Sequence, residues 1–290
     1  MADVNHRFID TNGIRMHIAE QGKGLLVVLC HGFPECWYSW RHQLPALAEA
    51  GYHAVAPDQR GYGQTDRPAR IDAYNILQLT GDIVGLVHAL GEERASIVGH
   101  DWGAPVAWYC GLLRPDIFHA VGLLSVPYFQ RTWQDMRPTE AMQRMAGEQE
   151  FYQLYFQETG KAEADLEADV RATLRMFLYS ASGDPPPEKR WRFLFRNSER
   201  FLDTGSLPDT LPAWLTERDL DVFTREFERT GFRGGRHSTS RTWMPSPPKT
   251  SRSTDWRSKC SILPSHSRHC RRSRCGVALK GNACAARRGP

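Results

Sequence analysis

Residues 98–103 read Val-Gly-His-Asp-Trp-Gly, and the fold class is predicted first from this segment. It follows a short apolar run and precedes a helical pattern from about Trp102 to Leu113. Small residues two before and two after a central nucleophile are typical of a sharp strand-to-helix turn that presents the central side chain at the end of a sheet. An ordinary helix-capping aspartate gives a similar pattern. The turn makes Asp101 the candidate nucleophile, at the positive end of a helix dipole.

Strand and helix patterns alternate on both sides of this turn. A hairpin is expected near the N-terminus, because Asn12-Gly13 favours a tight turn between residues 7–10 and 14–19. Further buried strands are predicted at residues 25–30, 53–56, 95–98 and 121–126, and helices at about 40–50, 76–90 and 102–113. This alternation predicts an α/β fold with a mostly parallel sheet covered on both faces.

Residues 140–230 have a different character, because they are helical, aromatic-rich and almost free of strand patterns. Proline-containing breaks at 185–187 and 207–208 divide them. We interpret the region as a helical cap inserted after a sheet strand, with an independent helical domain as the alternative. The predicted organisation is therefore the N-terminal part of a core over residues 1–127, a cap over 128–235 and a tail over 236–290.

The tail differs sharply from the body in charge. Its 55 residues hold 13 of the 37 lysines and arginines but a single acid, Asp255, so the tail carries about +12 and the body about −8. One interpretation is a natural basic tail that binds nucleic acid or an acidic surface. The other is a change of reading frame near codon 235, which leaves the C-terminal strands and helices of the core missing. Both predict a tail without regular structure, and its cysteines lack the paired spacing of a zinc site.

Other sequence features favour a cytoplasmic protein without a membrane partner. No apolar run approaches the roughly 20 residues that cross a bilayer, and the first residues do not resemble a secretory signal. Cys30, Cys36 and Cys110 are isolated from one another in the body of the chain, as expected for buried thiols in a reducing compartment.

The aspartate at the turn indicates displacement at a saturated carbon. A serine attacking such a carbon would leave a stable ether, whereas a carboxylate leaves an ester that water cleaves, and the carboxylate is already ionised at neutral pH. Epoxide opening and dehalogenation both fit this chemistry. The loop at residues 31–34, His-Gly-Phe-Pro, follows a predicted strand, and we expect the backbone N–H groups of Phe33 and Trp102 to form an oxyanion hole. Phe33, Pro34 and Trp102 are also expected to line an apolar pocket.

Three segments, residues 31–41, 58–63 and 99–104, resemble the soluble epoxide hydrolases of the α/β-hydrolase fold. Residues 151–158 resemble the cap segment of that family that carries the first of two substrate-facing tyrosines. The resemblance covers about residues 5–235.

This resemblance implies an epoxide hydrolase that converts an epoxide to a vicinal diol through an Asp101 ester. Tyr152 would hydrogen-bond the epoxide oxygen and help to protonate it. The alternatives are Tyr155 in that role, or a Tyr152 that only packs. The implied partners are a small apolar epoxide and water, with no cofactor and no metal.

The resemblance ends abruptly. Residues 231–234, Gly-Phe-Arg-Gly, match the family, but its Asn-Trp-Tyr, its late acid and its Gly-His motif do not follow. Since that histidine activates the hydrolytic water in the family, we expect a chain that is impaired in turnover and stalls as an alkyl-enzyme ester. The alternative functions are a haloalkane or haloacid dehalogenase, and a non-catalytic ligand-binding protein with the same fold.

Overall fold

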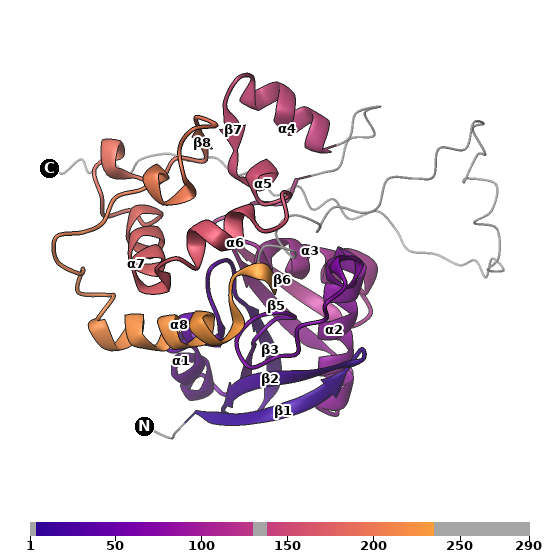
Figure 1. Ribbon diagram of the computed structural model, residues 1–290. Coiled ribbons are helices and arrows are strands. Elements are labelled where there is room, and N and C mark those ends of the chain that lie inside the picture. The colour runs from indigo at the N-terminus through magenta and orange to yellow at the C-terminus, as the bar shows by residue number, and fades with distance from the viewer. Residues whose placement is uncertain (1–3, 130–137, 235–290) are drawn as a thin grey trace, which may run out of the picture. The chain divides into compact units, whose positions relative to one another are not determined.

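The computed structural model describes residues 4–129 and 138–234, and its main sheet has six strands (Figure 1). The strands are, in chain order, β1 (Asn5–Thr11), β2 (Ile14–Gln21), β3 (Leu25–Cys30), β4 (Tyr52–Pro57), β5 (Ala95–His100) and β6 (Phe118–Leu124). Across the sheet the order is β1-β2-β4-β3-β5-β6. β2 pairs antiparallel with β1 and β4, whereas β4, β3, β5 and β6 run parallel to one another, which confirms the predicted mostly parallel sheet.

The predicted N-terminal hairpin is present, and its turn has the expected geometry. Asn12 and Gly13 have φ values of 44° and 74°, both in the left-handed region. Turns of this type match the twist of the flanking strands, and Asn and Gly are the residues that adopt them with least strain. The turn fixes the register in which Thr11 lies opposite Ile14.

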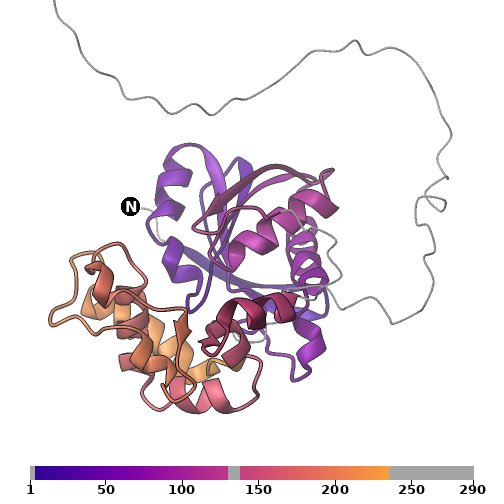
Figure 2. The same ribbon diagram turned by 90° about the horizontal axis from the view of Figure 1, so that it is seen from above.

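Helices cover both faces of the sheet (Figures 1 and 2). α2 (Ile76–Ala89) and α3 (Gly103–Leu113) cover one face, and α1 (Gln43–Glu49) covers the other. β3 shows why helices are needed on both faces of the sheet, because its side chains alternate between the two faces. Leu26 and Val28 pack in the core with α2 and α3, whereas Val27 and Leu29 pack with α1. The continuous apolar run of β3 is therefore that of a strand buried on both sides.

The remaining segment is a set of short helices with one small strand pair. Its elements are α4 (Pro138–Ala146), β7 (Glu150–Phe151), α5 (Tyr152–Tyr155), α6 (Lys161–Leu166), α7 (Val170–Ser180), β8 (Leu194–Phe195) and α8 (Glu217–Thr230), with the 3-10 turns η3 (Pro187–Lys189) and η4 (Phe201–Thr204). Two further 3-10 turns, η1 (Trp37–Trp40) and η2 (Ile71–Tyr74), belong to the part of the chain that carries the sheet. β7 and β8 pair antiparallel. Strands of two residues carry no alternating pattern, so the sequence gives no sign of this pair.

An aromatic cluster joins the helical segment to the loop after β3. Phe33 of that loop packs edge-to-face against Phe156, Phe177 and Phe232, with ring centroids 5.4, 6.0 and 6.1 Å away. Phe33 is 6 % exposed and Phe232 is fully buried. The start of α8 is fixed separately, because the hydroxyl of Tyr38 donates to Asp219 at 2.9 Å. The helical segment is thereby held over the loop that approaches Asp101.

The predicted tail, residues 236–290, lies outside the described residues, and the division of the chain at residues 127 and 235 stays a prediction. In the ranges that the structure describes, no helix combines the length and the apolar character needed to cross a membrane.

Candidate active site

The turn between β5 and α3 holds Asp101 in a strained conformation. Its φ is 48°, in the left-handed region that residues other than glycine rarely occupy. The backbone hydrogen bonds of the turn maintain this conformation, with Asp101 N–H donating to Leu124 O at 3.2 Å and Ala104 N–H donating to Asp101 O at 3.0 Å. Such strain persists only where the surrounding structure enforces it, and it is common at reactive groups.

Two glycines allow the backbone to close around this turn. A Cβ on Gly103 would lie 2.2 Å from the carbonyl oxygen of Cys30, so only glycine lets α3 start against the end of β3. A Cβ on Gly32 would lie 2.5 Å from the Cβ of Asp101, so the loop after β3 can touch the aspartate only through a glycine. The glycines at these positions therefore bring the loop and the turn into direct contact.

The carboxylate of Asp101 accepts hydrogen bonds from two backbone N–H groups. Phe33 N–H donates to Oδ1 at 2.9 Å, and Trp102 N–H also donates to the carboxylate. One donor comes from the loop after β3 and the other from the residue after Asp101. Both N–H groups predicted for the oxyanion hole therefore donate to the carboxylate of Asp101. The two donors fix the carboxylate in one orientation.

The pKa of Asp101 is raised to about 6, chiefly because the carboxylate is buried and also because Glu35 is nearby. The N–H groups of Phe33 and Trp102 and the charge of His100 act in the opposite direction. Asp101 is therefore ionised at neutral pH, yet more basic than an exposed aspartate. It is available as a nucleophile in the physiological range.

Glu35 and His100 form a partly buried support for the same loop. Glu35 Oε2 accepts from Gly32 N–H at 2.9 Å and lies 3.2 Å from His100 Nδ1. Burial by itself would raise the pKa of Glu35 and lower that of His100, but the contact between them reverses both shifts. Each group thus stabilises the charged form of the other, and the pair fixes the loop that carries Phe33. Glu35 was not among the residues predicted from the sequence.

An apolar cavity of about 200 Å³ lies next to Asp101. Its lining residues are Asp101, Trp102, Pro105, Trp108, Tyr109, Val126, Phe129, Tyr152 and Gln153. Of the three predicted pocket residues, Trp102 lines this cavity, whereas Phe33 and Pro34 do not. The side chain of Phe33 instead packs in the aromatic cluster described above. The spacing Pro105, Trp108 and Tyr109 on the helix after Asp101 could have suggested the cavity wall, because these residues share one helical face.

Tyr152 lines the same cavity. The phenol oxygen accepts a hydrogen bond from Gln153 Nε2 at 3.0 Å and another from the side chain of Trp102. Burial raises the pKa of Tyr152 well above its usual value, and the charge of Asp101 adds to this effect. The phenol therefore stays protonated across the physiological range and can donate a proton.

Tyr155, the alternative proton donor, points elsewhere. Its hydroxyl donates to Asp165 at 3.2 Å, and its ring is buried beside Phe195 and Phe201. It does not line the cavity next to Asp101. The structure thus brings Tyr152, and not Tyr155, together with Asp101.

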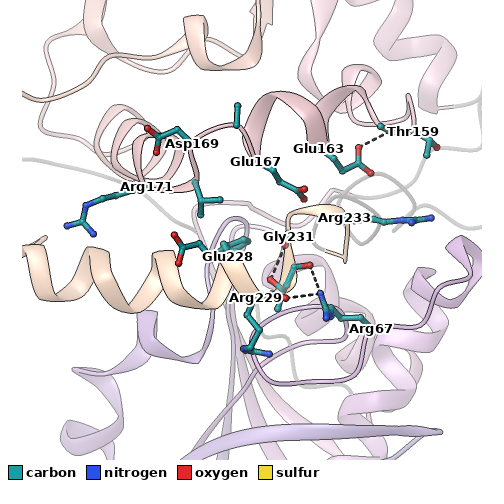
Figure 3. Close-up of a pocket in the computed structure, with 15 residues that line it drawn as sticks. Arg67, Thr159, Glu163, Glu167, Asp169, Arg171, Glu228, Arg229, Gly231 and Arg233 are labelled. Atoms are coloured by element: carbon teal, nitrogen blue, oxygen red, sulfur yellow. Dashed lines mark hydrogen bonds between the residues drawn. The ribbon is translucent and has the colours of Figure 1, made fainter.

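A larger open groove of about 890 Å³ lies within the helical segment, between α6, the start of α7 and the end of α8 (Figure 3). Charged side chains of both signs surround it, and some of them hold the backbone at the end of α8. Arg67 Nη1 donates to Thr230 O at 2.6 Å, and Glu167 Oε1 accepts from Phe232 N–H at 2.8 Å. None of the predicted site residues lines this groove. The smaller apolar cavity is therefore the candidate active site.

Residues 4–129 and 138–234 contain no group of three or more His, Cys, Asp or Glu side chains arranged to hold a metal ion. The polar side chains that line the cavity include the carboxylate of Asp101 and the phenol of Tyr152.

Comparison with known proteins identifies the family. A family model for the alpha/beta hydrolase fold matches residues 26–216. Epoxide hydrolase A of Mycobacterium tuberculosis is 47% identical over 237 residues, which cover 81% of this chain and 73% of the relative. Epoxide hydrolase 2 of Siraitia grosvenorii is 45% identical over 238 residues, which cover 81% of this chain and 72% of the relative.

Solved structures agree with these relatives. An epoxide hydrolase from an endophytic Streptomyces superposes with a TM-score of 0.78 at 50% identity, over 83% of this chain and 73% of that one. Epoxide Hydrolase A from Mycobacterium thermoresistibile gives a TM-score of 0.78 at 46% identity, over 83% of this chain and 75% of that one. The resemblance seen in the sequence motifs is thereby confirmed, and the chain belongs to the alpha/beta hydrolase fold family as an enzyme of epoxide hydrolase type.

Proposed function

We propose that Asp101 is the nucleophile and Tyr152 the proton donor in the opening of a small apolar epoxide. The observation that carries the proposal is that both side chains line one apolar cavity. Asp101 is ionised there and Tyr152 is protonated, as nucleophilic opening of a strained ether requires.

In the proposed step, a carboxylate oxygen of Asp101 attacks one carbon of the epoxide ring. The bond from that carbon to the ring oxygen breaks, and its electron pair stays on the oxygen. The ring oxygen takes the proton of the Tyr152 hydroxyl, which leaves a phenolate that water reprotonates. The product of the step is a hydroxyalkyl ester of Asp101, and no atom of the substrate is lost.

Hydrolysis of that ester would develop negative charge on its carbonyl oxygen. The N–H groups of Phe33 and Trp102 already point at the Asp101 carboxylate, so they would stabilise this charge. We assign them as the oxyanion hole. The second step also needs a base that activates water, and residues 236–290 contain no segment that matches the acid and the histidine of the family. We therefore propose that this chain forms the ester and hydrolyses it slowly.

The apolar substrate class follows from the walls of the cavity. Trp108, Tyr109, Val126 and Phe129 present mainly carbon to it, and a cavity of about 200 Å³ suits a small hydrophobic epoxide. We propose that residues 128–235 act as a cap, since they contribute Phe129 and Tyr152 to these walls.

A dehalogenase is less well supported. A departing halide needs N–H donors, and the ring N–H of Trp102 is engaged with Tyr152. A phenol beside the nucleophile serves an oxygen leaving group that must be protonated, and a halide has no such need.

The buried free thiols of Cys30, Cys36 and Cys110 support a reducing, cytoplasmic location as part of this proposal.

The test is intact-mass analysis of the full chain after incubation with styrene oxide or with 2-phenylethyl bromide. The proposal predicts an adduct with the whole mass of the epoxide, because the ring oxygen is retained, and predicts no adduct on Asp101→Asn. Bromide release with an adduct that lacks halogen would indicate the dehalogenase instead. Reversible binding without any adduct would indicate a binding protein. Steady diol production would overturn the slow second step and leave the assignment of Asp101 intact.

A further inference from the structure

We propose that Gln153 is a positioning residue for epoxide opening, acting through the hydroxyl of Tyr152. The inference rests on the proposed role of Tyr152 and assigns a function to its neighbour. The amide of Gln153 orients the phenol so that its proton points at the substrate, and it stabilises the phenolate that forms when the proton is transferred.

The first observation is the contact between the two side chains. Gln153 Nε2 lies 3.0 Å from the hydroxyl oxygen of Tyr152 and donates to it. Adjacent residues on a helix normally project in different directions and do not face each other. Here both side chains turn into the cavity that holds Asp101, although Tyr152 and Gln153 are the first two residues of α5.

The second observation concerns the hydrogen-bonding capacity of the phenol. A tyrosine hydroxyl has one O–H donor and accepts through lone pairs on its oxygen. Gln153 supplies one donor to that oxygen and the side chain of Trp102 supplies another. Because the acceptor positions are used by these two groups, the O–H bond is left to donate to a third group. The epoxide oxygen in the cavity is the group that needs a donor.

The third observation is electrostatic. Burial and the charge of Asp101 raise the pKa of Tyr152 and so oppose loss of its proton, whereas the hydrogen bonds from Gln153 and Trp102 lower it. When Asp101 is converted to an ester, its charge disappears and a phenolate appears at Tyr152. A donor already aimed at the phenol oxygen stabilises that charge without rearrangement.

The experiment is a double-mutant cycle on the full chain. The rate of ester formation with styrene oxide is measured by quenched intact-mass analysis, over a range of epoxide concentrations, for wild type, Gln153→Met, Tyr152→Phe and the double variant. Methionine keeps the length of glutamine and removes the donor. Gln157→Met is the matched control, since Gln157 lies one turn further on, does not line the cavity next to Asp101, and donates through its amide to the backbone oxygen of Gln153 at 3.3 Å.

We expect Gln153→Met to lower the limiting rate of ester formation about tenfold, which is about 1.4 kcal/mol in the barrier. The epoxide concentration at half saturation and the unfolding temperature should change little. In the Tyr152→Phe background the same substitution should have almost no effect, because the phenol through which it acts is gone. Gln157→Met should stay within about twofold of wild type.

Equal losses from Gln153→Met with and without Tyr152 would overturn the inference, because Gln153 would then act independently of the phenol. An unchanged rate in Gln153→Met, with a large loss in Tyr152→Phe, would overturn it as well and leave the proposed function standing. If Tyr152→Phe itself reacts at the wild-type rate, the proposed role of Tyr152 fails and this inference fails with it. Should Gln153→Met unfold, Gln153→Leu provides the same comparison.

Discussion

The backbone N–H of Phe33 donates to Oδ1 of Asp101 at 2.9 Å, although the two residues are 68 positions apart in the sequence. The contact joins the loop after β3 to the turn after β5, two parallel strands that lie side by side in the sheet. Because the carboxyl ends of parallel neighbours meet at one edge, the sheet itself brings the Phe33 N–H and the Asp101 carboxylate together. The side chain of Phe33 packs in the aromatic cluster with the helical segment, so one residue connects the site to that segment.

The rate of ester formation should depend on pH through Asp101. Its pKa is raised to about 6, and only the carboxylate attacks the epoxide. The rate should therefore be constant above that value and fall about tenfold per unit below it. Tyr152 stays protonated over this range, so no second decline is expected near neutral pH. Single-turnover rates in buffers of constant ionic strength test this, and a rate that rises as the pH is lowered through this range would show that the carboxylate is not the attacking form.

The two candidate tyrosines should behave differently when each hydroxyl is removed. Tyr152→Phe should slow ester formation by about 100-fold, the usual effect of losing a general acid. Tyr155→Phe is the matched control, because its hydroxyl bonds Asp165 outside the cavity. It should lower stability by about 1 kcal/mol and leave the rate near that of wild type. If Tyr155→Phe formed the ester more slowly than Tyr152→Phe, the general acid would be Tyr155 and not Tyr152.

Gly103→Ala should disrupt the turn that holds Asp101. The new Cβ would lie 2.2 Å from the carbonyl oxygen of Cys30, so β3 and α3 must separate. We expect a loss of about 1–3 kcal/mol in the free energy of unfolding, although alanine ordinarily favours a helix over glycine. Gly183→Ala is the control, since a Cβ there meets nothing within 4 Å. Urea unfolding of both variants measures the difference, and equal stabilities would contradict the close approach.

Phe232→Ala tests whether the last described segment is part of the fold. The ring is fully buried, with its centroid 4.6 Å from that of Phe227. Its removal should lower the free energy of unfolding by about 3–5 kcal/mol. Leu207→Ala, at a side chain that is 56% exposed, should change it by less than about 0.5 kcal/mol. A negligible effect of Phe232→Ala would mean that residues up to Gly234 do not complete the aromatic cluster.

Local sequence patterns predicted the parts of the fold that depend on local rules. The Asn12-Gly13 hairpin, the apolar run of β3 and the turn at Asp101 follow from residue spacing and from conformations that few residues adopt. β7 and β8 were missed because each has only two residues, and they exist only through their pairing in the folded chain.

The site was predicted less completely than the fold. Asp101 and Trp102 lie in one sequence motif and Phe33 in another, so the sequence was sufficient to propose all three. The direction of a loop side chain is set by packing, which is why Phe33 was placed in the pocket although it lies in the aromatic cluster. The side-chain hydrogen bond from Gln153 to Tyr152 joins adjacent residues on a short helix, where helical periodicity predicts no contact between their side chains. Glu35 was missed because its partners, Gly32 and His100, meet only after the sheet has formed.

The assignment of Asp101 as the nucleophile is tested most directly by finding where the epoxide binds covalently. The full chain is incubated with styrene oxide, quenched with acid and digested, and the modified peptide is sequenced by mass spectrometry. We predict a hydroxyalkyl ester on Asp101, absent from Asp101→Asn and released by mild base with recovery of the diol. A stable adduct on any other residue, formed equally in Asp101→Asn, would contradict the assignment of Asp101.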